Sequence, residues 1–261
     1  GRCGGAEVQS GMTALWTLGA MAAAMHAEKS GDLPTDISGL SIDTRSLGKG
    51  EAFFAITGDN RDGHDFVEAA FKAGAGLAVV ARDKRDRFAA DARLLIVPDV
   101  LDALRDLARA ARARSGARVI AVTGSVGKTS TKEALKLALA ADGETHASAA
   151  SYNNHWGVPL SLARLPETAR YAVFEIGMNH AGEITPLTKL VRPHVAIVTS
   201  IAPVHLEYFG TLKKIADAKA EIFLGLEAGG AGVINRDIRQ YAQLAKAAES
   251  AGISRIVSFG T

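Results

Sequence analysis

The chain has 261 residues, of which 30 are basic and 28 acidic, so its formal net charge is only +2. This balance argues against a general nucleic-acid or membrane-surface binder. No apolar run reaches the roughly 18–20 residues that a membrane-spanning helix needs. The single cysteine, Cys3, excludes an internal disulfide and fits a reducing compartment. We therefore expect a soluble, cytoplasmic α/β protein.

The first part of the chain predicts a small α/β domain. Met12 is the expected natural start, because residues 1–11 are glycine-rich and lack periodicity, so we interpret them as a leader or a flexible extension. Helices are predicted at 12–28, 64–75 and 99–116. Strands are predicted at 39–44, 52–56, 77–81 and 94–97. The stop of the last helix marks a boundary, which gives a first domain at 12–116.

From residue 118 onward, continuous apolar runs alternate with helical stretches. The apolar runs lie at 118–122, 171–176, 195–201, 231–235 and 254–259. The helical stretches lie near 129–141, 182–191, 212–226 and 236–250. This alternation is typical of a mainly parallel sheet with helices on both faces, which binds ligands beyond the carboxyl ends of its strands. We predict such a domain at 117–261 and expect its sheet to be incomplete.

The segment TGSVGKTS lies where a buried strand meets a helix. Gly124 and Gly127 allow the backbone N–H groups to turn toward a phosphate, Lys128 can reach the β- and γ-phosphates, and the Thr129 hydroxyl can bind Mg²⁺. The loop is shorter than the strict G-x-x-x-x-G-K-[ST] pattern, and the alternative is a glycine-rich turn without a nucleotide. The flanking strand and helix favour ATP or GTP. The nucleotide-binding residues that we expect are Thr123, Gly124, Ser125, Val126, Gly127, Lys128, Thr129 and Ser130.

Polar residues follow the other predicted strands. Glu175 ends the strand 171–176 and suits a Mg²⁺ ligand, although a glutamate there is by itself more often solvated or a cap. His205 follows the strand 195–201, where a lone histidine is usually structural. Lys219 lies in a mostly apolar helix, and its plain interpretation is a lysine whose stem runs along the core.

Two asparagine positions are also candidates. Asn235 ends the strand 231–235 and could hold a base or ribose, or cap the next helix. Asn153 and Asn154 precede a short apolar helix, but asparagine pairs are common in turns. Each of these signals is weak when taken alone.

Taken together and in order, these motifs resemble those of the Mur ligase family. The segments that carry the resemblance are AVTGSVGKTSTKE, SYNNHWGVPLSL, FEIGMNHAGEI, TSIAPVHLEYFG and AKAEIF. The segment SIDTRSLGKGEAFFAITGDNRDGHDFVEAAFKAGA is similar to the UDP-sugar-binding first domain of that family. The resemblance covers nearly the whole chain from Met12, and it implies a UDP-sugar-binding α/β domain followed by a P-loop-type ATPase domain.

The resemblance also implies the ligands of the nucleotide site. Lys128 and the glycine loop would hold the ATP phosphates, and Thr129 and Glu175 would bind one Mg²⁺. His205 would help to bind a second Mg²⁺. Lys219 matches a position that is N-carboxylated by CO₂ in the family, and the resulting carboxylate could support the second metal.

Roles for the asparagines and for the first domain follow from the same resemblance. Asn154, with Asn153, would lie near the γ-phosphate and the reacting carboxylate of the UDP substrate, and Asn235 would contact adenine. The catalytic residues implied are Lys128, Asn154, His205 and Lys219. The uridine-nucleotide contacts implied are Thr44, Arg45 and Ser46. For these three the alternative is an ordinary turn with a solvated arginine.

The implied activity is that of an ATP-dependent acid–D-amino-acid ligase of peptidoglycan precursor synthesis, acting as a monomer. The NNxxGVP form favours the member that joins D-Ala-D-Ala to UDP-MurNAc-tripeptide through an acyl phosphate. The alternatives are a sister Mur ligase such as MurE, a folylpolyglutamate-type synthase, or a non-catalytic nucleotide-binding module. The family normally continues into a third domain, so we expect this chain to be inactive alone. The third residue of the stem peptide is left open.

Overall fold

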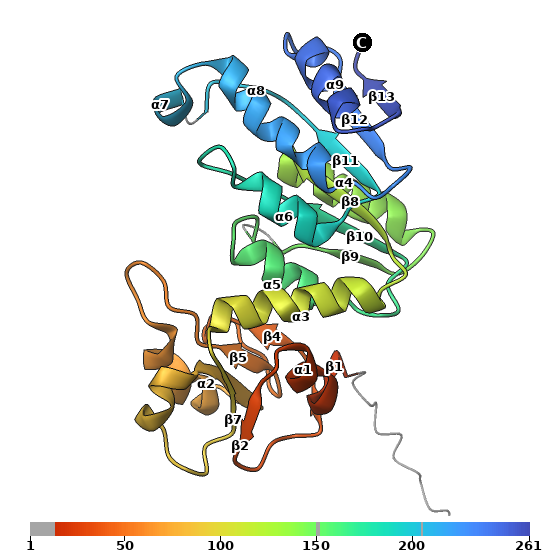
Figure 1. Ribbon diagram of the computed structural model, residues 1–261. Coiled ribbons are helices and arrows are strands. Elements are labelled where there is room, and N and C mark those ends of the chain that lie inside the picture. Colours follow the sequence, from red (N-terminus) through yellow and green to blue (C-terminus); the bar gives the residue numbers. More distant parts are fainter. Residues whose placement is uncertain (1–13, 150–151, 205) are drawn as a thin grey trace, which may run out of the picture. The chain divides into compact units, whose positions relative to one another are not determined.

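The computed structural model describes residues 14–149, 152–204 and 206–261. The chain divides into two compact units, Gly1–Val100 and Leu101–Thr261, which can be followed along the colour bar in Figure 1. The division falls after Val100, one helix earlier in the chain than the boundary expected after residue 116. The predicted domain ranges stay a prediction. Within the described ranges, no helix is long and apolar enough to cross a membrane.

The first unit contains a five-stranded sheet with the order β2-β7-β6-β5-β4, in which only the β2–β7 pair is antiparallel. Its elements are β1 (Trp16–Thr17), α1 (Leu18–Ala24), β2 (Glu28–Ser30), β3 (Asp36–Ile37), β4 (Leu40–Ser41), β5 (Ala52–Phe54), η1 (Gly63–Phe66), α2 (Val67–Lys72), β6 (Leu77–Ala81), η2 (Arg82–Arg87) and β7 (Leu94–Val97). Buried apolar side chains from β5, β6, β7 and α2 form its core. The predicted α/β class is confirmed.

The helix expected at 12–28 is wrong in extent, since α1 has only seven residues. The Thr17 side chain accepts a hydrogen bond from Ala20 N and caps its start. His26 then adopts a left-handed backbone with φ of +50°, which ends the helical path. Glu28 pairs with Ile96 in the adjacent strand, so strand pairing replaces the last predicted turn.

Helix α3 (Val100–Arg114) confirms the amphipathic helix predicted at 99–116. It buries Leu104, Leu107 and Ala108 completely. Near its end, the buried Arg112 donates from Nε to Val191 O and from a terminal nitrogen to Arg192 O, both at 2.9 Å. These bonds satisfy carbonyl groups at the end of another helix and tie α3 to the rest of the second unit.

The second unit contains a six-stranded sheet, all parallel, with the order β13-β12-β11-β8-β10-β9. Its elements after α3 are β8 (Arg118–Thr123), α4 (Lys128–Ala140), β9 (Thr145–Ala147), α5 (Gly157–Ala163), β10 (Tyr171–Glu175), α6 (Ile184–Val191), β11 (Val195–Val198), α7 (Leu206–Phe209), α8 (Leu212–Ala220), η3 (Glu221–Gly225), β12 (Ala231–Asn235), α9 (Tyr241–Ser250) and β13 (Arg255–Phe259). The parallel sheet predicted from the alternation is confirmed.

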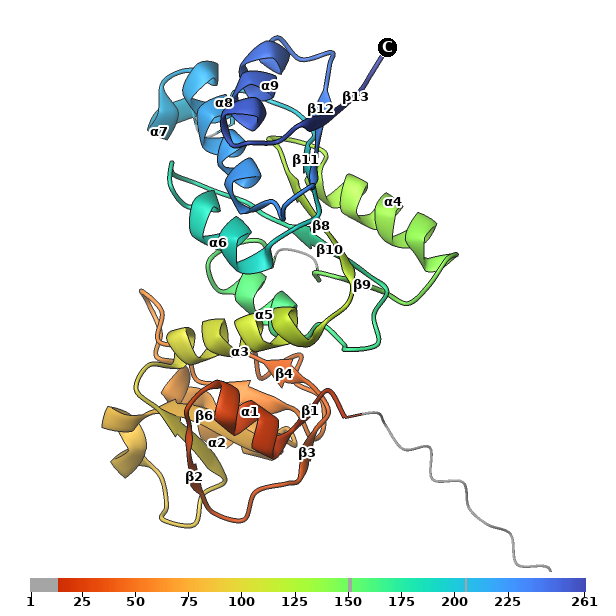
Figure 2. The same cartoon turned by 45° about the vertical axis from the view of Figure 1, so that its right-hand side comes forward.

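Helices cover both faces of this sheet, and Figure 2 shows α4 on one side and α6 and α8 on the other. On the α4 side, Leu135 and Leu139 pack against Val122, Val173 and Ile197 from three strands. This packing fixes α4 over the central strand β8 and sets the position of the loop that joins them.

The register of the central strands brings three chain segments to one edge of the sheet. Val122 of β8 pairs with Glu175 at the end of β10, and Thr123 pairs with Val198 at the end of β11. The loop after β8 is therefore flanked by the ends of β10 and β11. Glu175 therefore lies next to the predicted phosphate loop.

Candidate nucleotide site

The loop after β8 is a sharp turn that two glycines allow. Gly124 has a φ of +152° and Gly127 a φ of +89°, both in the region that favours glycine. A Cβ atom on Gly124 would lie 1.9 Å from the Thr199 hydroxyl, so no side chain fits there. Helix α4 begins immediately afterwards at Lys128, and its first N–H groups lie at the loop. A helix start of this kind is an anion-binding site.

Residues after β11 hold the loop in this conformation. Ser125 N donates to Ser200 O and Val126 N donates to Ser200 Oγ, both at 2.9 Å. Thr199 Oγ1 donates to Val126 O at 2.6 Å, and the Ser125 hydroxyl exchanges hydrogen bonds with the backbone of Ala202. The chain's own hydrogen bonds therefore fix the shape of the turn. We expected no role for Thr199 and Ser200, because the strand expected at 195–201 included both, whereas β11 ends at Val198.

A hydroxyl and a carboxylate meet beside the loop. Thr129 Oγ1 donates to Glu175 Oε2 at 2.8 Å, and Asn153 Nδ2 donates to Glu175 Oε1 at 2.8 Å. The Glu175 residue is only 4% exposed. Lys128 Nζ donates to Gly124 O at 2.9 Å. A buried carboxylate, a hydroxyl and a lysine thus surround the helix start.

This donor set fits Mg²⁺. Both neighbouring donors are oxygens, and Mg²⁺ in nucleotide sites is held by one or two protein oxygens together with substrate phosphates and water. Among the described residues, no three histidine, cysteine, aspartate or glutamate side chains form a metal-binding group. The residues suit a metal that a phosphate shares, not a metal enclosed by protein alone.

A cavity of about 130 Å³ opens at this point. Its lining includes Lys128 and Lys219 from two different helices, together with Asn153 and Gly124. Lys219 is 2% exposed. Burial, and then repulsion from Lys128, lowers the pKa of Lys219 from 10.5 to about 7. The Lys219 amine is therefore buried together with its stem, whereas a snorkelling lysine would keep its amine in water.

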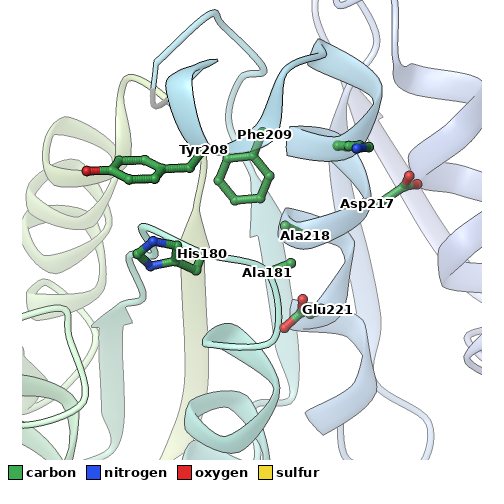
Figure 3. Close-up of a pocket in the computed structure, with 8 residues that line it drawn as sticks. His180, Ala181, Tyr208, Phe209, Asp217, Ala218 and Glu221 are labelled. Carbon is green, nitrogen blue, oxygen red and sulfur yellow. The ribbon is translucent and has the colours of Figure 1, made fainter.

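A second cavity has a volume of about 390 Å³, and Figure 3 shows its lining. The lining residues are His180, Ala181, Tyr208, Phe209, Lys214, Asp217, Ala218 and Glu221. The His180 ring packs edge-on against Tyr208, with centroids 4.7 Å apart. Glu221 accepts hydrogen bonds from Gly182 N and Thr185 N, and so holds the loop that carries His180. None of these residues was expected from the sequence to form a site.

In the first unit, residues 43–46 form a tight turn. The Arg45 guanidinium donates to both oxygens of Asp43, and Arg45 N also donates to Asp43 Oδ1 at 3.0 Å. These bonds lower the pKa of Asp43 to about 2. Ser41 Oγ braces the same turn, and the Arg45 side chain is 88% exposed. The turn presents an oriented arginine to solvent, with Thr44 and Ser46 beside it.

The comparisons with known proteins decide the family. The Mur ligase middle domain matches residues 122–261, which is more than half of the chain, and the catalytic domain of the Mur ligase family matches residues 36–112. The chain belongs to the Mur ligase family.

Several of its relatives are named for one member of that family. A UDP-N-acetylmuramoyl-tripeptide–D-alanyl-D-alanine ligase of Rickettsia prowazekii is 38% identical over 85% of this chain and 49% of its own length. MurF from Acinetobacter baumannii is 34% identical with a TM-score of 0.81, over 94% of this chain and 53% of that one. MurF from Thermotoga maritima, solved with ADP, is 28% identical with a TM-score of 0.68, over 84% and 49%. This Mur ligase chain thus spans about half the length of these relatives.

The predicted site residues of this Mur ligase chain are only partly brought together. Lys128, Thr129, Glu175 and Lys219 converge on the sheet edge, whereas His205 lies outside the described residues. Thr123 is buried at the end of β8, and Ser125 and Val126 lie in the turn with Ser130 exposed on α4.

The three predicted asparagines differ in what they contact. Asn153, not Asn154, contacts Glu175 and lines the cavity. Asn154 Oδ1 accepts hydrogen bonds from Trp156 N and Gly157 N, and so caps the start of α5. Asn235 donates to Thr199 O and accepts from Asp237 N. The catalytic role of Asn154 and the adenine contact of Asn235 stay predictions.

Proposed function

We propose that this Mur ligase is an ATP-dependent amide ligase of peptidoglycan precursor synthesis that joins D-Ala-D-Ala to UDP-MurNAc-tripeptide. One arrangement carries the proposal: Lys128, Lys219 and Asn153 line one cavity, and Asn153 also contacts Glu175, which the Thr129 hydroxyl contacts in turn. It places a cationic group and metal-binding oxygens at a helix start. The names of the relatives support this choice of acceptor and donor. The ADP complex of the Thermotoga maritima relative supports a nucleotide at the loop.

The chain's own groups suit the first chemical step. The N–H groups at the start of α4 and the Lys128 ammonium would bind the β- and γ-phosphates of ATP. Thr129 and Glu175 would hold Mg²⁺, which supplies charge neutralisation at the phosphate oxygens. A carboxylate oxygen of the tripeptide attacks the γ-phosphorus, the bond to the β-phosphate oxygen breaks, and ADP leaves. The product is an acyl phosphate.

The second step needs positioning more than a protein nucleophile. The amine of D-Ala-D-Ala, once it has lost a proton, attacks the acyl carbon, and inorganic phosphate leaves as the amide forms. The Lys128 ammonium would stabilise the negative charge that develops on the phosphoryl oxygens. Asn153 would orient Glu175 throughout, because its amide already donates to that carboxylate.

Lys219 is proposed as a site of N-carboxylation. A pKa of about 7 leaves a large share of the amine neutral at physiological pH, and a neutral amine reacts with CO₂ to give a carbamate and a proton. The carbamate would replace repulsion from Lys128 with attraction. With His205, it would hold a second Mg²⁺.

In the first unit, Thr44, Arg45 and Ser46 are proposed to bind the uridine nucleotide, since the turn presents an exposed guanidinium that Asp43 orients. The protein is proposed to act as a cytoplasmic monomer. Asn154 and Asn235 keep their proposed places near the γ-phosphate and the adenine.

Calorimetry tests the substrate. The chain is titrated with UDP-MurNAc-tripeptide and with UDP-MurNAc-dipeptide, beside Arg45→Ala and a control, Lys72→Ala, which alters an exposed lysine of the same unit. Tripeptide binding that only Arg45→Ala weakens would support the proposal. Preference for the dipeptide would indicate a sister Mur ligase. Binding of neither, with nucleotide binding intact, would leave a nucleotide-binding module.

A further inference from the structure

We propose that Lys132 is a positioning residue that fixes the carboxylate of Glu175 through Ser148. This inference rests on the proposed function, since it concerns how the metal-binding carboxylate is held. Lys132 lies one helical turn beyond Lys128 on α4, and no role for it follows from the phosphate loop itself.

Lys132 is fully buried, with 0% of its surface exposed. A buried lysine is rare and costly unless its ammonium group is paired. Its Nζ donates to Ser148 O at 2.8 Å and lies 2.9 Å from Glu133 Oε1. The hydrogen bond from Lys132 lowers the pKa of Glu133. The ammonium therefore donates to a backbone carbonyl and pairs with a carboxylate that is half exposed.

Ser148 connects this ammonium to the metal site. It is buried, and its N–H donates to Val173 O at 3.1 Å. Its hydroxyl accepts from Glu175 N at 3.2 Å. The residue that Lys132 holds thus holds the peptide of Glu175 in turn.

Helix α4 consequently reaches Glu175 in two ways. Thr129 contacts the carboxylate directly, and Lys132, three residues further along on the same side of the helix, acts through Ser148. The same chain segment supplies Asn153, whose carbonyl accepts from Gly177 N and whose amide donates to Glu175. A charged donor makes the Ser148 bond stronger than a neutral one would be. Lys132 therefore sets where the carboxylate stands relative to the start of α4.

The test compares Lys132→Met with Lys136→Met, because Lys136 lies one turn further along the same helix and is exposed. Amide hydrogen exchange of the metal-free chain is the first readout. In Lys132→Met, exchange at Ser148 and Glu175 should accelerate about tenfold or more, since the bond that anchors this segment is lost. Lys136→Met should leave exchange at both amides unchanged.

Nucleotide titration is the second readout. The Mg²⁺ concentration that half-saturates the enhancement of ADP binding should rise about tenfold in Lys132→Met, whereas ADP affinity without Mg²⁺ should change less than about twofold. A lysine that served only stability would weaken both kinds of binding alike, and that result would overturn the inference. Unchanged Mg²⁺ dependence together with unchanged exchange would overturn it as well.

A second variant covers the case in which Lys132→Met fails to fold. Ser148→Ala keeps the carbonyl that Lys132 contacts but removes the hydroxyl that accepts from Glu175 N. It should speed exchange at Glu175 and raise the Mg²⁺ requirement, and no change in either would overturn the inference. If the unaltered chain binds no nucleotide with Mg²⁺, the proposed function fails, but the exchange experiment still tests the link between Lys132, Ser148 and Glu175.

Discussion

Replacing Lys219 with methionine should stabilise the fold, and the gain should depend on pH. The pKa of Lys219 falls from 10.5 to about 7 on folding, chiefly through burial and then through repulsion from Lys128. Below pH 7 both folded and unfolded chains carry the ammonium, so the cost of burying it is complete. Between about pH 7 and 10.5 the unfolded chain binds more protons than the folded chain, and stability rises with pH. The full shift in the Lys219 pKa corresponds to at most ~5 kcal/mol in the free energy of unfolding.

Urea unfolding in CO₂-free buffer at pH 6, 7, 8 and 9 measures this effect. At pH 6 the free energy of unfolding of Lys219→Met should exceed that of the unaltered chain by several kcal/mol. The gap should narrow above pH 7, by up to ~1.4 kcal/mol for each pH unit. Lys136→Met, which removes an exposed lysine, should show no such trend. A gap for Lys219→Met that stays constant from pH 6 to pH 9 would refute the reasoning.

Three further changes have defined outcomes. Glu175→Gln should weaken Mg²⁺-dependent ADP binding by about tenfold or more in calorimetry, because it removes the metal-binding charge. Gly124→Ala should abolish ADP binding and lower the melting temperature, since its Cβ would lie 1.9 Å from the Thr199 hydroxyl. Burial raises the pKa of Asp62, but hydrogen bonds from His64 outweigh it and bring the pKa to about 2. Asp62→Asn should therefore cost ~1–2 kcal/mol in urea unfolding at neutral pH, a loss that disappears between about pH 4 and pH 2.

The sheet edge could be predicted from sequence because chain order and apolar runs determine it. Alternating strands and helices imply parallel neighbours, and parallel neighbours bring Glu175 beside the phosphate loop. The glycines of that loop were recognisable because a left-handed backbone at Gly127 favours one residue type. These features are local or follow from the topology of the sheet.

The details of the cavity depended on tertiary packing. Nothing in the sequence distinguishes Asn153 from Asn154, and the turn before α5 decides which amide faces Glu175. Burial of Lys219 depends on how α8 packs within the second unit, and a helical sequence pattern does not report this packing. Lys132 is buried on a helix whose other lysine after the first turn, Lys136, is exposed, so residue type alone could not separate them.

Binding of ADP with and without Mg²⁺ tests the central claim most directly, since that claim is a metal–nucleotide site formed by the loop after β8 and the end of β10. Calorimetry on the unaltered chain, Lys128→Met and Lys136→Met would make the comparison. We predict saturable binding that Mg²⁺ strengthens and that only Lys128→Met greatly weakens. ADP binding that neither Mg²⁺ nor Lys128→Met alters would contradict the account.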